Sequence, residues 1–184
     1  KNAILVSLKK MLHDKNFGTE GHDLRMKKMC EKLGKKLDLS DSDIHKLVLL
    51  AGLHDIGKAA IPIQLLMEPE LLTEEDRKEM QNHSAIGFRI ANSNSDINQI
   101  AEGILYHHER WDGKGYPSGL IGKKIPLEAR MVSIVDAYDD MVNDSPYKKA
   151  ITRDEAIDEL RRNKGTKFDP YLVDAFIETI LEKD

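Results

Sequence analysis

Hydrophobic residues recur along this chain at intervals of three and four positions, the spacing of one face of an α-helix. The first such segment runs from Ile4 to Leu12. The second, from about Glu20 to Leu37, places Met26, Met29 and Leu33 on one stripe. No stretch alternates between apolar and polar residues strongly enough to predict a β-strand. The pattern therefore predicts an all-α fold.

Residues that typically begin helices divide this pattern into further elements. A Ser or Thr followed three positions later by an acidic residue can form a capping box, and an Asp-Pro pair suits the first helical turn. We expect helices to begin near positions 40, 73, 152 and 169, with others over 97–105 and 128–142. The first should end at Gly57 to Pro62, and the second should run past His83 to Ile90. The start signals are Ser40 with Asp43, Thr73 with Asp76, Thr152 with Glu155, and Asp169-Pro170.

A Gly- and Pro-rich loop separates two of these helices, from Arg110 to about Pro126. Its composition is compatible with one small hairpin. We expect residues 1–18 to form an N-terminal helix, either a connector to an upstream domain or part of the core. Residues 19–184 should form one domain, and the start at Lys1 rather than Met suggests a piece of a longer protein.

Charge and composition narrow the classes of function. The chain has 184 residues, a formal net charge of −4 and a pI near 6.0, which argues against broad binding to long nucleic acids. A small anionic substrate stays compatible, because a metal ion supplies positive charge locally. Cys30 is the single cysteine, so no intrachain disulfide forms. No apolar run reaches about 18 residues, and we expect a cytoplasmic protein without a membrane insertion.

Several histidines lie where a packed helix would bury them. His54-Asp55 ends an apolar run over residues 47–53, and His22 shares its stripe with Met26. His83 shares a face with Gly87. Each of these alone is as well explained by a core histidine that is satisfied by hydrogen bonds.

The pair His107-His108 shifts this balance. Two protonated imidazoles side by side repel each other, whereas neutral imidazoles are good metal ligands. Asp136 also interrupts the apolar stripe of the helix over 128–142, and a buried carboxylate needs a cation or hydrogen bonds. Only His13 and His45 are expected on the surface.

The combined set favours two metal ions. Imidazole with carboxylate suits Mn, Fe or Zn rather than Ca. Seven ligands exceed the needs of one ion, whereas two ions that share a carboxylate are typical of phosphoester hydrolysis. The alternative is a helical bundle with buried histidines and no metal. The candidate ligands are His22, His54, Asp55, His83, His107, His108 and Asp136.

Two motifs in this set are similar to those of a known family. His54-Asp55-Ile56-Gly57-Lys58 matches the H-D-x-G-K pattern of the HD superfamily of metal-dependent phosphohydrolases. Residues 107–117 read H-H-E-R-W-D-G-K-G-Y-P and match H-H-E-x-x-D-G-x-G-Y-P. Together they resemble the HD-GYP subfamily, which hydrolyses cyclic di-GMP. The resemblance implies an HD-domain helical bundle with residues 110–126 as the GYP loop.

The resemblance also implies roles for the matched residues. Lys58 would bind substrate phosphate and act with Asp55 in catalysis, Tyr116 would line the substrate pocket, and Lys148 would lie near the phosphates. One metal would be held by His22, His54, Asp55 and Asp136, and the second by Asp55, His83, His107 and His108.

Two positions depart from the family pattern. Some members have a glutamate, here Gly18, that supports a third metal, and Glu20 lies on a different helical face. We therefore expect two divalent ions, Fe or Mn. Ser145 stands where the family often has a phosphate-binding arginine, which would weaken binding or change the preferred cyclic dinucleotide.

The function that the resemblance implies is hydrolysis of cyclic di-GMP to 5′-pGpG, and further to GMP in some members, by attack of a water held between the metals. A phosphodiesterase for another cyclic dinucleotide such as cyclic GMP-AMP is one alternative. A weakly active sensor or interaction module is another. The GYP loop would also contact GGDEF-type cyclase domains, and a homodimer is left open.

Overall fold

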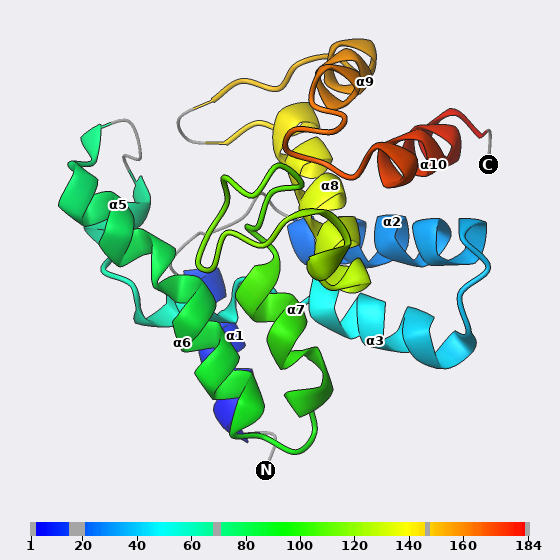
Figure 1. Ribbon diagram of the computed structural model, residues 1–184. Coiled ribbons are helices and arrows are strands. Elements are labelled where there is room, and N and C mark those ends of the chain that lie inside the picture. The colour runs from blue at the N-terminus through cyan, green and yellow to red at the C-terminus, as the bar shows by residue number, and fades with distance from the viewer. Residues whose placement is uncertain (1–2, 15–20, 68–70, 146–147, 183–184) are drawn as a thin grey trace.

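The computed structural model describes residues 3–14, 21–67, 71–145 and 148–182. Within these ranges the chain is helical and forms isolated β-bridges but no sheet, which confirms the predicted all-α class (Figure 1). The elements are α1 (Ala3–Asp14), α2 (His22–Lys36), α3 (Asp41–Ala51), η1 (Ile56–Ala60), α4 (Ile63–Met67), α5 (Glu74–Gln81), α6 (His83–Asn92), η3 (Asn98–Ile100), α7 (Ala101–Tyr106), η4 (Gly122–Lys124), α8 (Leu127–Val142), α9 (Arg153–Arg162) and α10 (Pro170–Leu181).

The hydrophobic core lies where α2, α3, α8 and α10 pack together, to the right of centre in Figure 1. The stripe predicted for α2 is largely correct, since Met26 and Leu33 are fully buried there and Met29 is partly buried. Most apolar side chains of α8 are buried, so this helix runs through the interior. Any polar group that α8 presents inward must therefore find a partner inside the protein.

A second group of elements, α1, η1, α6 and α7, lies beside this core. Helix α1 packs on η1, and α6 packs on both η1 and α7. The closest approach is at Gly57, where an added Cβ would lie 1.9 Å from the backbone oxygen of His83. A side chain at position 57 would thus force η1 and α6 apart.

Two predicted helices have different limits in the structure. The helix that begins at position 41 ends at Ala51, before Gly52, and η1 follows as a separate 3-10 helix. The helix expected over 73–90 is two helices, α5 and α6, joined at Asn82. The Asn82 N–H bonds the carbonyls of both Lys78 and Glu79, and this tightening of the last turn separates the two helices.

The predicted helix starts at positions 73, 152 and 169 are confirmed. Thr73 and Thr152 form capping boxes, and the Asp169 side chain accepts the N–H groups of Tyr171 and Leu172. At position 40, Ser40 accepts the Asp43 N–H as expected, although its own hydroxyl, not its backbone, donates to the Asp43 carboxylate.

The loop over 110–126 contains no strand pair. Its ends meet in a single antiparallel bridge between Asp112 and Ile121, so the hairpin that its composition allowed is reduced to one bridge. The candidate third-metal positions Gly18 and Glu20 lie outside the described residues.

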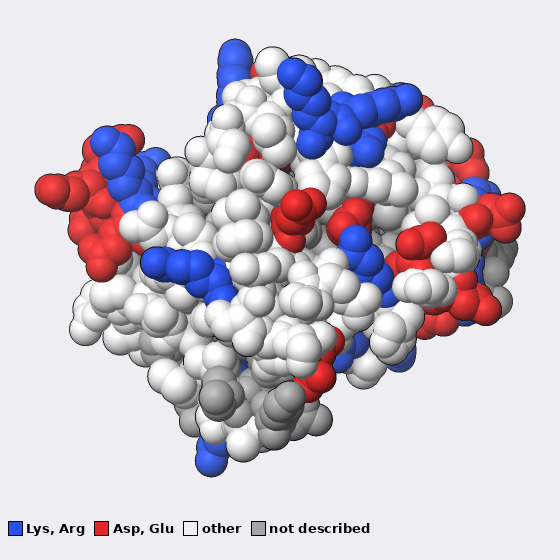
Figure 2. Space-filling view, turned by 60° about the horizontal axis from the view of Figure 1, so that its bottom comes forward, with Lys and Arg blue, Asp and Glu red and all other residues white. Residues whose placement is uncertain are grey.

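Charged side chains are interspersed on the face shown in Figure 2. Blue and red groups alternate among uncharged residues, and that face has no continuous basic stripe of the kind that follows a nucleic-acid backbone.

Candidate metal centre

The structure brings together all seven residues that the sequence singled out as ligands, although they come from five separate segments. His22 begins α2, and His54-Asp55 lies between α3 and η1. His83 begins α6, His107-His108 follows α7, and Asp136 lies within α8. The packing of these elements therefore converges on one point.

The ligand atoms form two groups, each within 4.8 Å. Asp55 links them, because its Oδ1 is 3.5 Å from His83 Nε2 and its Oδ2 is 3.5 Å from His54 Nε2. A carboxylate with one oxygen facing each group is suited to bridge two ions. The first group is His22, His54 and Asp136, and the second group is Asp55, His83, His107 and His108.

Three histidines are oriented by the backbone. Nδ1 of His54 lies 2.8 Å from the carbonyl oxygen of Ala51, and the other two make the same bond to the residue three positions earlier, at 2.8 Å from Met80 and 2.6 Å from Ile104. A carbonyl only accepts, so Nδ1 carries the proton and Nε2 keeps its lone pair free. These three are His54, His83 and His107.

The freed nitrogens have no hydrogen-bond partner. Nε2 of each of these histidines, and of His108, is buried without one, as is Oδ1 of Asp55. Buried polar atoms are rarely left unsatisfied, and several that converge on one point are typical of ligands that hold a cation. The donor set of imidazole nitrogens and carboxylate oxygens fits Mn, Fe or Zn. The residues present therefore fit the predicted metal centre.

His22 is oriented by a side chain that the sequence did not assign to the site. Its Nδ1 donates to Oδ2 of Asp139 at 2.7 Å, which leaves Nε2 toward Asp136 at 3.7 Å. Asp139 is 1% exposed and also accepts from Arg25 Nε at 2.6 Å and from Asn143. The sequence feature that could have identified Asp139 is its position one turn after Asp136, on the same buried face of the helix.

At His83, His108 and Asp55 the electrostatics favour neutral imidazoles beside an ionised carboxylate. Burial lowers the pKa of His83 to about 4. Burial, with His107 and His83 nearby, also holds the pKa of His108 well below its usual range. Burial alone would raise the pKa of Asp55, but the charges of Lys58 and His54 outweigh it and hold that pKa well below its usual range. These groups are therefore in the ionisation states that metal binding requires.

His54 and Asp136 form a pair within the first group. Burial lowers the pKa of His54, but Asp55 and Asp136 outweigh that effect and raise it to about 9. His54 conversely lowers the pKa of Asp136 against the effect of burial. Asp136, predicted to be buried, has a side chain that is 29% exposed, so this group is open to solvent on one side.

The predicted substrate-binding residues lie in different surroundings. Lys58 Nζ is 2.7 Å from Oδ2 of Asp55, so this lysine does point into the centre. The Tyr116 ring stacks on His108, with centroids 4.9 Å apart and planes at 18°. Lys148 is exposed, and its ammonium lies 3.3 Å from Asp140. Of the two histidines expected on the surface, His45 is exposed, and the side chain of His13 lies outside the described part.

A family model described as an HD domain matches residues 7–172 of this chain. The chain belongs to the HD-domain family. The match covers every candidate ligand and most of the elements that position them. Such domains are named for a His-Asp pair, which in this chain is His54-Asp55. This pair lies where the two ligand groups meet.

Relatives of this HD domain include named phosphodiesterases. The cyclic di-GMP phosphodiesterase response regulator RpfG of Xanthomonas campestris is 38% identical over 175 residues, which cover 94% of this chain and 46% of that protein. The 3′3′-cGAMP-specific phosphodiesterase 2 of Vibrio cholerae is 36% identical over 162 residues, 87% of this chain and 31% of that protein. The resemblance to HD-GYP proteins is therefore confirmed.

A solved structure shares the fold. A cyclic GMP-AMP-specific phosphodiesterase of V. cholerae superposes with a TM-score of 0.72 at 21% identity, over 96% of this chain and 48% of that one. This likeness confirms the helical HD-domain architecture. The HD domain spans less than half the length of each of these three proteins. No helix in the described ranges combines the length and apolar character needed to cross a bilayer.

Proposed function

We propose that this HD domain is a metal-dependent phosphodiesterase that hydrolyses a cyclic dinucleotide, with cyclic di-GMP as its main substrate. The observation that carries the proposal is the pair of ligand groups joined by Asp55, around which buried imidazole nitrogens lack hydrogen-bond partners. Named relatives at 36% and 38% identity act on cyclic dinucleotides. Metal and phosphoester chemistry are thus supported by independent observations.

The chain's own residues would divide the work as follows. Two divalent ions, Fe or Mn, would supply Lewis-acid charge and an activated water when held by the two groups. Asp55 would keep the groups at a fixed spacing, because each of its oxygens faces a different histidine. Lys58, with Nζ 2.7 Å from Asp55, is placed to offset negative charge on the phosphoryl oxygens. The ring of Tyr116 would form one wall of the substrate pocket.

The product of the first hydrolysis would be linear 5′-pGpG. One phosphodiester bond of the ring breaks between phosphorus and the 3′ oxygen, and water supplies the hydroxyl on phosphorus and the proton on the departing oxygen. A second hydrolysis at the remaining bond would give GMP. The open side of the centre at Asp136 gives the substrate access from solvent.

Cyclic GMP-AMP is the second candidate substrate. One relative named above is specific for 3′3′-cGAMP at 36% identity. Ser145 stands in place of an arginine that often binds phosphate in the family, and it is held in a tight turn by backbone bonds to Lys148 at 2.9 and 3.3 Å. A serine at this position removes one positive charge from the expected phosphate contacts. The substrate preference can therefore differ from that of enzymes specific for cyclic di-GMP.

Turnover with a matched variant pair tests the proposal. Protein loaded with Mn²⁺ or Fe²⁺ is incubated with cyclic di-GMP, 3′3′-cGAMP and cyclic di-AMP, and the products are separated by chromatography. We expect 5′-pGpG from the wild type, background rates from Asp55→Ala, and wild-type rates from His45→Ala, which removes an exposed histidine on α3. If the wild type binds the cyclic dinucleotides but forms no product from any of the three, the proposed phosphodiesterase activity is wrong and a sensor role is favoured.

A contact of the loop over 110–126 with GGDEF-type domains stays a prediction. Tyr116 is a poor residue for testing it, because its ring lies against His108 and its loss would disturb the metal centre. Ile121, 60% exposed at the outer side of the loop, is the better choice. Ile121→Asp should abolish capture of such a domain while leaving turnover intact.

A further inference from the structure

One buried carboxylate near the centre belongs to neither ligand group. Glu109 follows His108 directly and is 3% exposed. Its Oε1 accepts the N–H of Ser118 at 2.7 Å, and its Oε2 accepts the N–H of Leu120 at 2.9 Å. Both oxygens are thus used to hold the far side of the loop over 110–126, at the place where the chain turns through Gly119 (φ +68°).

Tyr116 lies between Glu109 and Ser118, the first of the two residues that Glu109 holds. The Tyr116 N–H donates to the carbonyl of His108 at 3.3 Å. At Gly115 an added Cβ would lie 2.4 Å from the Arg110 nitrogen and 2.5 Å from the His108 oxygen, so the loop backbone lies directly on the ligand segment. The Tyr116 ring reaches its stacked position on His108 because the loop is folded back in this way.

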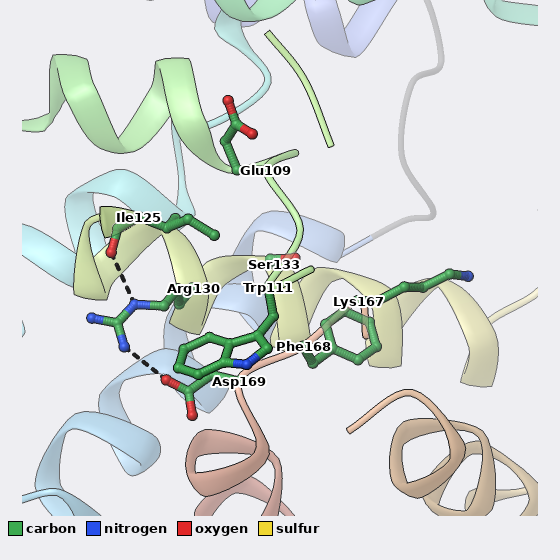
Figure 3. Close-up of a pocket in the computed structure, with 8 residues that line it drawn as sticks. All are labelled: Glu109, Trp111, Ile125, Arg130, Ser133, Lys167, Phe168 and Asp169. Carbon is green, nitrogen blue, oxygen red and sulfur yellow. Dashed lines mark hydrogen bonds and ion pairs between the residues drawn. The ribbon is translucent and has the colours of Figure 1, made fainter. Parts of the chain in front are cut away.

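The base of the same loop is held from the opposite side. Trp111 and Asp112 donate backbone N–H groups to the carbonyls of Lys167 and Thr166, at 3.1 and 2.9 Å. Arg130 of α8 bonds the carbonyl of Ile125 and pairs with Asp169 at 2.7 Å. Figure 3 shows Trp111 beside this pair and the Glu109 carboxylate pointing away from it. Glu109 is therefore the buried side chain that ties residues 118–120, while the Asp112 carboxylate accepts the Lys114 N–H at 3.1 Å.

We propose that Glu109 is a positioning residue for the substrate pocket, which fixes the 116–120 segment so that Tyr116 is held against His108. The expected effect of Glu109 on catalysis rests on the proposed function. Hydrogen bonds from backbone N–H groups to a carboxylate are about twice as strong as neutral ones, and burial strengthens them further. Without the carboxylate, the N–H groups of Ser118 and Leu120 lose their acceptor, and this part of the loop is no longer tied to the residue that follows His108.

The substitutions Glu109→Gln and Glu109→Ala separate this role from a general structural one. Glutamine keeps one acceptor oxygen and the volume, whereas alanine removes both acceptors. In metal-loaded protein we expect the amides of Ser118 and Leu120 to exchange faster with solvent in both variants, more so in the alanine variant. Trp111, the single tryptophan of the chain, reports on the base of the loop, and its emission should change little.

The kinetic expectation is a split between KM and kcat. KM for the cyclic dinucleotide should rise roughly tenfold in Glu109→Ala, because a displaced wall loosens the substrate, while metal content per chain stays at the wild-type value. Glu128→Gln is the matched control: it removes a partly buried carboxylate of α8 that pairs with Lys46 of α3, outside the loop. It should alter neither amide exchange in the loop nor KM.

Two results would overturn the role of Glu109. One is unchanged exchange at Ser118 and Leu120 in Glu109→Ala. The other is a fall in metal content or in thermal stability large enough to account for the whole kinetic effect. A wild type that hydrolyses no cyclic dinucleotide would contradict the proposed function instead, and amide exchange would still test the tie between Glu109 and the loop.

Discussion

Asp139 and His22 meet at 2.7 Å, with the histidine Nδ1 donating to a carboxylate that is 1% exposed. The other histidines with a defined Nδ1 partner use a backbone carbonyl three residues earlier. His22, the first residue of α2, uses a carboxylate from α8 instead. A carboxylate is a stronger acceptor than a carbonyl, so it fixes the ring orientation and raises the basicity of the ligand.

Asp139→Asn should therefore weaken metal binding at the His22 group. Loss of such a partner typically lowers metal affinity by about 10- to 100-fold, and we expect a decrease in this range for the first group with little change for the second. Competition with a chromophoric chelator measures both affinities. Asp140→Asn changes an exposed neighbour, 65% exposed, and should leave both affinities unchanged. Equal weakening by the two variants would contradict the role of Asp139.

Gly57 should control the second group in a different way, through the backbone. A methyl at position 57 would collide with the His83 carbonyl and with the Gly87 nitrogen at 2.7 Å. We expect Gly57→Ala to displace α6, to destabilise the protein by about 1–3 kcal/mol, and to reduce the metal bound per chain. Metal analysis and thermal unfolding measure the two effects.

Gly34→Ala supplies the matched control for that variant. Its added Cβ would lie 3.0 Å from Cγ1 of the Ile44 side chain, on α3 and away from the metal ligands. Alanine also favours the helix interior by about 1 kcal/mol over glycine. This variant should keep the wild-type metal content, and a loss of metal there would show that any packing defect empties the site.

Removal of metal should destabilise the folded state. The unpartnered Nε2 atoms and the Asp55 oxygen would find metal ions as partners only in the native protein, and a ligand that binds only the native state stabilises it. At about 100 times its Kd, each ion would add about 2.7 kcal/mol. Thermal unfolding with chelator or with added Mn²⁺ should show a lower midpoint without metal. The same midpoint in both conditions would exclude specific binding.

The pair between Arg130 and Asp169 should matter for stability rather than for chemistry. Their side chains are 12% and 6% exposed, and breaking a buried pair from one side costs about 3–5 kcal/mol. Arg130→Ala should therefore lower the unfolding midpoint and shift the emission of Trp111, whose ring centroid is 6.0 Å from the guanidinium carbon. Unaltered emission would mean that the pair does not support the loop.

The sequence predicted most of the fold and the ligand set because both depend on local patterns. Helical spacing and capping residues are properties of short segments, and they located α2, α8 and α10 to within a few residues. The ligands could be recognised because a polar residue on an apolar stripe needs a partner. The break at Asn82 was missed, because apolar spacing continues across it and tertiary packing decides where the chain turns.

Relationships between distant segments were not accessible in the same way. Asp139 lies on the buried face of α8, but its contact with His22 spans 117 residues and depends on how α2 packs against α8. Glu109 was recognised only as the glutamate of the H-H-E motif. Its hydrogen bonds to Ser118 and Leu120 depend on a loop conformation that composition does not determine. The sequence pattern thus identifies which residues need partners, and the tertiary packing determines which residues those partners are.

Metal analysis of the purified, Mn²⁺-equilibrated protein tests whether seven side chains hold a centre of two metal ions. We predict about two ions per chain in the wild type and a clear loss in Asp55→Ala, because that carboxylate faces both groups. Only trace metal in the wild type, or the same content in the two proteins, would contradict it.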